Sequence, residues 1–241
     1  MGGYKAAGGY KVAIIGAGAM GSLLAYRIPA GFRKVIISRE RAGAAEIADE
    51  VGGLASDQVS AVRGCQVIFL AVPGSAASQF VREMTPHLAE NALVVNMAPD
   101  LYTGDLAAEH ADVRLAAAKV LGHSDELEAG ARGVVVLDHV DEEAEERLRQ
   151  LLELFGPVIR GSETMVQEAG AAVVAVMEEA RRNLVDRLTV LGLDKHLARV
   201  VLAGAAPGVL RAMAHLDEGT PAKGAIDRSK AGAAPEDWAS H

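Results

Sequence analysis

The 241-residue sequence has one cysteine, Cys65, and only 4% aromatic residues. A single cysteine excludes an internal disulfide framework and a cysteine-based metal cluster, and it is typical of a reducing compartment. Scarce aromatic residues argue against a stacking platform for single-stranded nucleic acid. The formal net charge of −8 disfavours a general nucleic-acid partner or an anionic membrane surface. We therefore expect a cytoplasmic protein that binds neither, with Cys65 as a small core residue.

Other functional patterns are also missing. No apolar run reaches the length of a membrane span, and residues 1–9 read as a Gly/Ala-rich flexible leader without the apolar region of a signal peptide. No Gly-x-Ser-x-Gly or Walker sequence is present, which argues against a hydrolase or a kinase. Five histidines outside the candidate site show no ligand spacing, so we predict no metal site; they are His87, His110, His139, His196 and His215.

The sequence does contain a glycine motif near its start. Residues 11–15 form a short apolar run that predicts a buried strand, and residues 22–27 resemble a helix. Between them, Gly16 allows a tight turn, Gly18 lets the backbone approach a pyrophosphate, and Gly21 lets the helix pack closely on the strand. Strand, glycine turn and helix together predict a dinucleotide site with phosphates at the helix start. The alternative is a glycine-rich turn with no ligand.

The pattern beyond the glycine motif predicts an α/β fold. Strand-like apolar runs alternate with helix-like stretches as far as a charged amphipathic helix over residues 141–155. Such alternation predicts a doubly wound parallel sheet with right-handed crossovers, a Rossmann domain over residues 10–161. The expected strands are residues 11–15, 34–38, 66–72, 93–97, 113–117 and 133–137.

The rest of the chain has no strand signals. Apolar residues recur at helical spacing from Glu163 until Gly192 ends the helix, Asp194 can cap the next helix, and a third is expected after Pro207. We predict an all-helical domain over residues 162–228 and a flexible tail over residues 229–241, which contains Trp238. A domain this small and apolar cannot bury all of its apolar surface by itself, so we expect a homodimer through these helices.

The turn after the second expected strand indicates which dinucleotide binds. In NAD-binding folds an acidic residue bonds the ribose hydroxyls at this point, but here the sequence is Ser38-Arg39-Glu40-Arg41. A hydroxyl and a guanidinium, with Arg41 nearby, suit a 2′-phosphate, which an aspartate would repel. We therefore predict NADP(H) rather than NAD(H). Two alternatives stay open: Glu40 could serve the ribose, or the segment is an ordinary polar turn.

With these residues the sequence resembles the pyrroline-5-carboxylate reductase family and its NADP-binding oxidoreductase relatives. The resemblance covers residues 11–227, and the stretches that carry it are Ile15–Gly21, Ser38-Arg39, Phe69–Pro73, Phe155-Gly156 with Glu163–Met165, Val190–Leu193 and Thr220–Gly224. It implies an NADPH-dependent reductase of a C=N bond, with the active site between the carboxyl edge of the sheet and a helical domain shared across a dimer. It also implies the residues that bind NADP: Gly16, Ala17, Gly18, Ala19, Met20, Ser38 and Arg39, with Ala71, Val72 and Pro73 beside the nicotinamide ribose.

The sequence departs from this family in three places. Val72 stands where the family usually has a lysine, and Ala116-Ala117-Ala118-Lys119 replaces a Met-Pro-Asn segment. Residues 167–172 replace the Ser/Gly/Pro-rich helix start that binds the substrate carboxylate in the family. The resemblance thus supports cofactor binding, and it does not support pyrroline-5-carboxylate as the substrate.

The candidate catalytic residues follow the later strands. Lys119 is expected just beyond a strand end at the carboxyl edge, where it could donate a proton or anchor an anionic substrate; a solvated lysine is the alternative. His123 could act as an acid near neutral pH, unless it is only a surface group. Glu163 could bind a substrate amine or cap the long helix. Asn96 and Tyr102 follow an earlier strand end and are expected to line the same cleft, Asn96 as a cofactor contact.

These observations predict an NADPH-dependent reductase that transfers hydride to a small imine and works as a homodimer. One alternative enzyme exchanges hydride between NADP and a second carrier such as a deazaflavin. An alternative of another class is a non-catalytic NADP-binding regulator that has lost its substrate contacts.

Overall fold

The computed structural model describes residues 10–213, with side chains as far as residue 210. The expected leader, the expected tail with Trp238 and the run Thr220–Gly224 lie outside the described residues. The chain separates into two compact units, residues 1–170 and residues 171–241. The division falls inside helix α7 (Glu163–Val190), so the domain limits expected at residues 161 and 162 stay a prediction.

The first unit is built on one sheet with the strand order β3-β2-β1-β4-β5-β6-β7-β8. The strands from β3 to β6 in this order are parallel, which confirms the expected doubly wound arrangement for this part. β7 runs antiparallel to β6, and β8 is parallel to β7, so the last two strands run in the opposite direction. The strands are β1 (Lys11–Ile15), β2 (Arg33–Ile37), β3 (Leu54–Ser56), β4 (Val67–Leu70), β5 (Leu93–Asn96), β6 (Leu115–Leu121), β7 (Val134–Asp138) and β8 (Val158–Arg160).

The reversed direction of β7 and β8 differs from the expected parallel sheet, and two further features of the sheet differ as well. The strand expected over residues 113–117 is wrong in its bounds, because β6 extends to Leu121 and Lys119 pairs with Val136 inside it. β3 and β8 were not expected, since each has three residues and is too short to show a periodic pattern.

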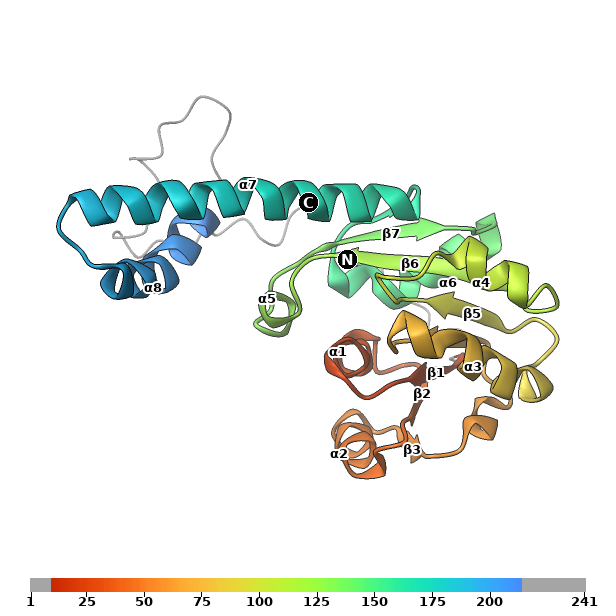
Figure 1. Ribbon diagram of the computed structural model, residues 1–241. Coiled ribbons are helices and arrows are strands. Elements are labelled where there is room, and N and C mark those ends of the chain that lie inside the picture. Colours follow the sequence, from red (N-terminus) through yellow and green to blue (C-terminus); the bar gives the residue numbers. More distant parts are fainter. Residues whose placement is uncertain (1–9, 214–241) are drawn as a thin grey trace, which may run out of the picture. The chain divides into compact units, whose positions relative to one another are not determined.

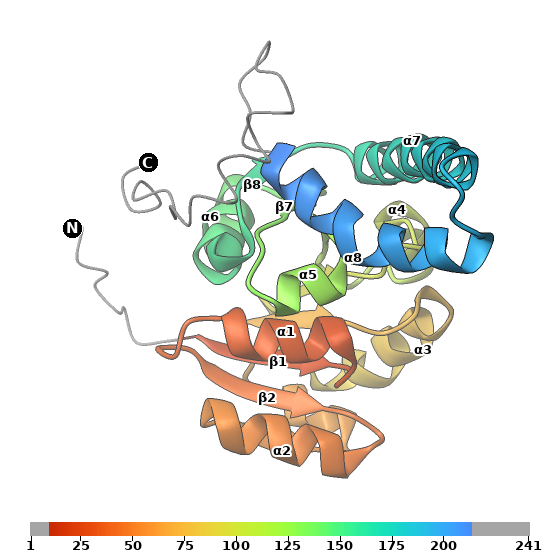
Figure 2. The ribbon, with the colours of Figure 1, turned by 90° about the vertical axis from the view of Figure 1, so that its left-hand side faces the viewer.

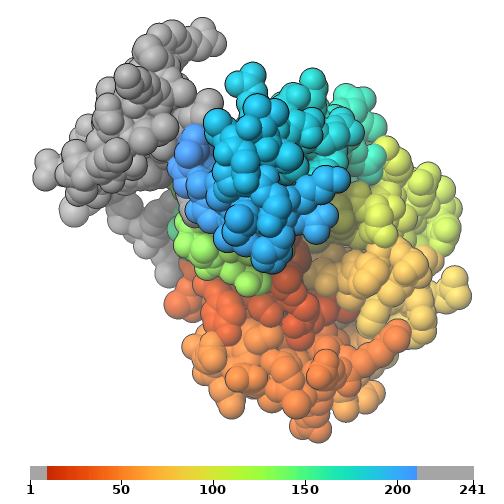
Figure 3. All heavy atoms as spheres, turned by 60° about the vertical axis from the view of Figure 1, so that its left-hand side comes forward, coloured from red at the N-terminus to blue at the C-terminus, as the bar shows by residue number. Residues whose placement is uncertain are grey.

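Helices cover both faces of the sheet. Along β1, Val12 and Ile14 pack into the apolar cluster with α1, α2 and α6, whereas Ala13 and Ile15 pack on the other face with α3 and α4. Figure 1 shows α1 and α2 on one side of β1 and β2 and α3 on the other, and Figure 3 shows α1 and α2, in red and orange, as the outer surface of their face. The helices are α1 (Ala19–Arg27), α2 (Arg41–Val51), α3 (Gly74–Met84), α4 (Thr103–Glu109), α5 (Ser124–Glu128) and α6 (Glu142–Leu152), with 3₁₀ turns η1 (Val59–Val62), η2 (Thr85–His87) and η3 (Glu153–Phe155).

The second unit contains the rest of α7 and helix α8 (Lys195–Met213), joined by a short turn (Figure 2). Gly192 ends α7 with a φ of 91°, and the Asp194 carboxylate accepts hydrogen bonds from the amides of His196 and Leu197, as the sequence predicts. The third helix expected after Pro207 was wrong, because α8 continues through this proline. Among residues 10–213, no helix is long and apolar enough to cross a membrane.

Candidate active site

The glycine loop has the geometry that its spacing predicts. Gly16 has a φ of 108°, and a Cβ there would lie 2.3 Å from the Ala71 carbonyl oxygen. A Cβ at Gly21 would lie 1.8 Å from the Gly16 carbonyl oxygen, so α1 can only approach the loop this closely with glycine. At Gly18 a Cβ would meet nothing within 4 Å. Two of the glycines are therefore needed for packing, and the third leaves open space at the start of α1.

The carboxyl ends of the central strands lie side by side. The Gly16 amide donates to the Ile37 carbonyl at 2.8 Å, and the Ala71 amide donates to the Ile15 carbonyl at 2.8 Å. The Met97 amide continues this series by donating to the Leu70 carbonyl at 3.2 Å. Turns that are far apart in the sequence thus meet at one edge, which is where ligands bind in open α/β sheets.

A cleft of about 340 Å³ lies at this edge. Its volume is near the lower limit of small-molecule pockets, so it could hold one end of a dinucleotide but not the whole molecule. The expected contacts Met20, Ala71, Val72 and Pro73 all line it. The residues after β5 were missed, although the rule that ligands bind at the carboxyl ends of strands could have found them. These missed lining residues are Met97, Ala98, Pro99 and Asp100.

The turn after β2 exposes its charged side chains. Arg39 and Arg41 are both exposed, and Arg41 is the first residue of α2. The Arg39 guanidinium carbon lies 5.2 Å from the ring centroid of Phe80 on α3, a cation–π contact that the sequence did not reveal. The Ser38 hydroxyl accepts a hydrogen bond from the Glu40 amide at 3.2 Å. Two cations and a hydroxyl therefore stand at the β2 end of the edge, and the exposed Glu40 lies beside them.

Lys119 is buried, with 3% of its surface exposed. Its ammonium donates to the carbonyls of Ala98 and Leu101, the latter at 3.0 Å, and lies 3.1 Å from Glu163 Oε2. The expected position beyond the strand end was wrong, because β6 continues past this residue. Burial lowers the pKa of Lys119, and the nearby Glu163 carboxylate opposes this shift. Each of the three protons of the ammonium thus has an acceptor.

Glu163 is also 3% exposed, and it is the first residue of α7. Its carboxylate accepts hydrogen bonds from the Thr103 amide at 2.9 Å and the Thr103 hydroxyl at 3.0 Å. The Glu163 amide donates to Asp138 Oδ2 at 3.0 Å, and the Thr164 amide donates to the Ser162 hydroxyl at 3.2 Å. The carboxylate of Glu163 therefore binds Thr103 and Lys119 rather than capping its own helix.

The remaining expected residues are divided between this network and the surface. Asn96 is fully buried, and its amide donates to the Leu101 carbonyl and the Thr103 hydroxyl, both at 3.0 Å. Its expected cofactor role would have to act through these neighbours. The Tyr102 hydroxyl donates to Gln167. His123 precedes α5, its side chain is 73% exposed, and its Nδ1 lies 3.9 Å from Asp125 Oδ2.

One group of side chains resembles a metal site. Ligand atoms of Asp138, His139 and Glu163 lie within 4.8 Å of one another. Asp138 already accepts hydrogen bonds from the amides of His139 and Glu163, and the Lys119 ammonium already neutralises Glu163. These contacts account for the group without a cation. The absence of a metal site stays a prediction.

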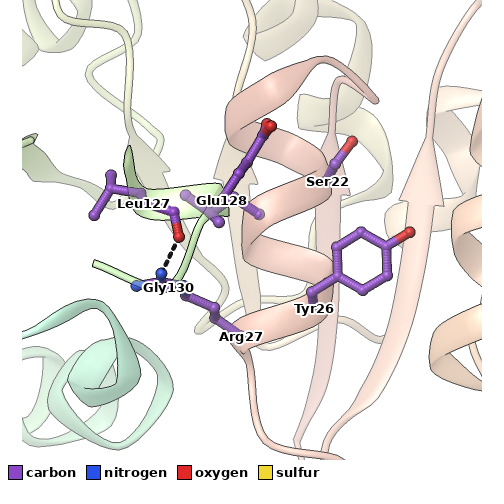
Figure 4. Close-up of a pocket in the computed structure, with 7 residues that line it drawn as sticks. Ser22, Tyr26, Arg27, Leu127, Glu128 and Gly130 are labelled. Carbon is purple, nitrogen blue, oxygen red and sulfur yellow. Dashed lines mark hydrogen bonds between the residues drawn. The ribbon is translucent and has the colours of Figure 1, made fainter. Parts of the chain in front are cut away.

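A second hollow of about 390 Å³ lies between α1 and α5. Figure 4 shows Ser22 and Tyr26 on α1, with Leu127 and Gly130 beside the helix. The Arg27 guanidinium there donates to carbonyls of three residues, Leu127, Ala131 and Leu154. The hollow contains none of the expected site residues, and its one cation already has partners.

The sheet, the glycine loop and the cleft define a dinucleotide-binding domain of the Rossmann type, followed by a long helix. Residues 11–100 match the family described as "NADP oxidoreductase coenzyme F420-dependent". This match and the pyrroline-5-carboxylate reductase structures below confirm the resemblance to such NADP oxidoreductases, from which the chain diverges. No curated protein matches the chain in sequence.

Solved structures share the fold over most of the chain. A pyrroline-5-carboxylate reductase from Coxiella burnetii is 18% identical with a TM-score of 0.68, over 94% of this chain and 86% of that one. Plasmodium falciparum pyrroline carboxylate reductase with NADP bound is 17% identical with a TM-score of 0.59, over 92% and 84%. An imine reductase from Myxococcus stipitatus in complex with NADP+ is 21% identical with a TM-score of 0.59, over 85% and 74%. At these identities the likeness establishes the fold.

Proposed function

We propose that the protein is an NADPH-dependent reductase that transfers hydride to the carbon of a small imine. The observation that carries this proposal is the arrangement of the carboxyl edge. An arginine-bearing turn follows β2, an open glycine turn follows β1, and the cleft follows β4 and β5. This is the order in which an extended dinucleotide meets its 2′-phosphate, pyrophosphate and nicotinamide contacts.

The residues present fit NADP(H). The α1 N-terminus has no side-chain cap and no acidic residue in its first turn, so its amides suit a pyrophosphate next to Gly18. Ser38, Arg39 and Arg41 would hold the 2′-phosphate. The apolar cleft lining, which includes Val72, would hold the nicotinamide end. The match to an NADP oxidoreductase family and the NADP-bound relatives of similar fold support the same cofactor.

The nicotinamide supplies the hydride when it is bound, and the chain must orient it and exclude water. An iminium carbon already accepts hydride readily, so the protein needs only to keep the imine nitrogen protonated. Among the three expected catalytic residues, Lys119 and Glu163 are buried and paired with each other, whereas the ring of His123 is exposed. We therefore retain His123 as the candidate acid and give Lys119 and Glu163 a different task below.

The direct test is turnover. The purified protein is incubated with NADPH and a panel of small cyclic imines, and NADPH oxidation is followed by its absorbance. Oxidation that requires both protein and imine, with a KM for NADPH about tenfold higher in Gly18→Ala, is the expected result. NADPH binding without turnover of any acceptor would contradict the reductase and favour the regulator.

A hydride exchange between NADP and a deazaflavin is the second candidate. The observation that favours it is the family match over residues 11–100, whose description names coenzyme F420. A deazaflavin is a large planar acceptor, so its ring would have to reach the nicotinamide through an open side of the cleft. Replacing the imine by coenzyme F420 in the same assay distinguishes the two, because only this second reaction changes the deazaflavin absorbance.

We also propose that the protein works as a homodimer through α7 and α8. The proposal is supported by the large apolar side chains that these helices expose in a single chain, which would be covered in a dimer. Sedimentation should give twice the 25.1 kDa mass of one chain, and Val174→Glu should return the protein to one chain. A monomer at micromolar concentration would contradict this. The exposed side chains on these helices are Met165, Val173, Val174, Val176, Met177, Val190, Leu197, Val200, Val201, Val209 and Leu210, and Leu191 is exposed in the turn between them.

A further inference from the structure

The segment Ala98–Leu101, which we call the cleft wall, lies within the connection from β5 to α4, and its residues Ala98, Pro99 and Asp100 line the cleft. Other elements hold each of its residues. Lys119 on β6 binds the carbonyls of Ala98 and Leu101. Gln167 on α7 donates to the Pro99 carbonyl at 3.2 Å, and the Gly74 amide at the start of α3 donates to Asp100 Oδ1 at 3.1 Å. The wall has no regular structure of its own, so these contacts set its position.

Glu163 contacts both Lys119, whose ammonium binds the cleft wall, and Thr103. It is paired with Lys119 on one side and accepts two hydrogen bonds from Thr103, which directly follows the wall and Tyr102. Gln167 lies one helical turn further along α7, on the same face as Glu163, and it contacts both the wall and Tyr102. The first two turns of α7 and the strand β6 thus both contact the cleft wall through hydrogen bonds.

The charges of the pair are not needed for stability alone. A buried ion pair loses so much hydration that two well-packed apolar residues of the same size would serve folding equally well. A lysine ammonium can, however, do what an apolar side chain cannot, because its three donors hold two carbonyls and one carboxylate at once. The pair therefore fixes backbone positions in the wall that packing would leave free.

We propose that Lys119 and Glu163 are positioning residues that hold the cleft wall and thereby set the affinity for the nicotinamide end of the cofactor. This inference rests on the proposed function for the identity of the ligand. Neither side chain reaches a ligand directly, since both are about 3% exposed and their polar atoms are engaged with each other, with the wall or with Thr103. The two ends of the cofactor should therefore respond differently when the pair is removed.

The test is the double variant Lys119→Met/Glu163→Gln, which removes both charges and leaves no buried ion without a partner. The Kd for NADPH depends on contacts along the whole carboxyl edge, whereas the Kd for 2′,5′-ADP depends only on contacts at the end near Arg39. We expect the Kd for NADPH to rise about tenfold or more, because the displaced cleft wall would no longer fit the nicotinamide end. The Kd for 2′,5′-ADP should stay the same within about twofold, which is on the order of the error of a free-energy comparison. The control is Glu145→Gln, which breaks the ion pairs of Glu145 with Arg149 and Arg160 and should change neither Kd.

A second readout needs no nucleotide. In the unliganded protein, amide hydrogen exchange over residues 97–103 should accelerate in the double variant and stay slow in the control. Equal losses of affinity for NADPH and 2′,5′-ADP, or unchanged exchange over this segment, would overturn the positioning role. If the unaltered protein binds no NADPH but exchange still accelerates, the proposed function and the affinity claim fail while the positioning role stands.

Discussion

The two ends of the carboxyl edge are built in opposite ways. At the β1–β2 end the groups that suit a ligand are open: Gly18 faces empty space, and Arg39 and Arg41 are exposed. At the β5–β6 end the polar groups are buried and paired with each other, as Lys119 and Glu163 are. The first end is ready to contact phosphates directly. The second shapes a cleft whose own lining is largely apolar.

This contrast separates direct binding from positioning. Substitutions at the open end should change ligand affinity and leave folding intact, because few protein contacts are lost. Substitutions at the buried end should change folding first and affinity through the shape of the cleft. The predictions below test this division, beginning with the largest effect.

Lys119→Met alone should be the most damaging change. It leaves the Glu163 carboxylate buried without its ammonium partner, which costs about 3–5 kcal/mol of the free energy of unfolding. Chemical denaturation measures this loss directly. The double variant Lys119→Met/Glu163→Gln should recover most of it, and a double variant no more stable than the single one would contradict the account of the buried end.

Arg39→Ala should weaken NADPH binding by about 10- to 100-fold, the range of one charge-assisted hydrogen bond. Binding of NADH, which lacks the 2′-phosphate, should hardly change, and the midpoint of thermal unfolding should stay where it is. Phe80→Leu removes the ring under the guanidinium, so it should weaken NADPH binding by a smaller factor than Arg39→Ala. Because Phe80 is also a buried core residue of α3, this variant should in addition lower the midpoint of thermal unfolding. Equal losses for both nucleotides would show that Arg39 does not read the 2′-phosphate.

Gly18→Ala should lower NADPH affinity about tenfold, since its methyl group would stand where the pyrophosphate approaches. The free protein has room for that methyl group, so the free energy of unfolding should be nearly unchanged. Gly21→Ala is the matched contrast, because its Cβ would clash with the Gly16 carbonyl and should destabilise the protein. Calorimetry of both variants without nucleotide, followed by NADPH titration, separates the two roles.

Asp141→Ala should have the smallest effect and lies outside the edge. The Asp141 carboxylate caps α6 by accepting from the Ala144 amide at 2.8 Å, a contact worth about 1 kcal/mol. The hydrogen bond from the Ala144 amide, followed by that from Arg114, lowers the pKa of Asp141 below its ordinary value. The stabilisation is therefore present above the unfolded pKa and is lost as the pH falls through the lower folded pKa. A difference between the variant and the unaltered protein that persists in strong acid would contradict this.

The same contrast explains what could be predicted from the sequence. The strand–glycine–helix unit and the Ser38–Arg41 turn are local, so spacing alone revealed them. Gly192 and Asp194 were predictable for the same reason, since each acts on its own helix. The parallel direction of β1, β2, β4, β5 and β6 followed from the alternation of strands and helices.

The buried end could not be predicted because its contacts join distant parts of the chain. Lys119 was expected just beyond a strand end, since the three alanines Ala116–Ala118 carry no pattern that shows where β6 ends. Glu163 had the local features of a helix cap, whereas its partners are 44 and 60 residues away in sequence. The reversal of β7 and β8 likewise depends on how the chain returns to the sheet, which no local pattern encodes.

The central claim is that this edge binds NADP(H), and titration of the unaltered protein with NADPH and with NADH tests it most directly. Nicotinamide fluorescence follows both titrations. We predict saturable binding of NADPH at least about tenfold tighter than binding of NADH, the discrimination expected of charged contacts to a 2′-phosphate. Failure of both nucleotides to bind would contradict the claim.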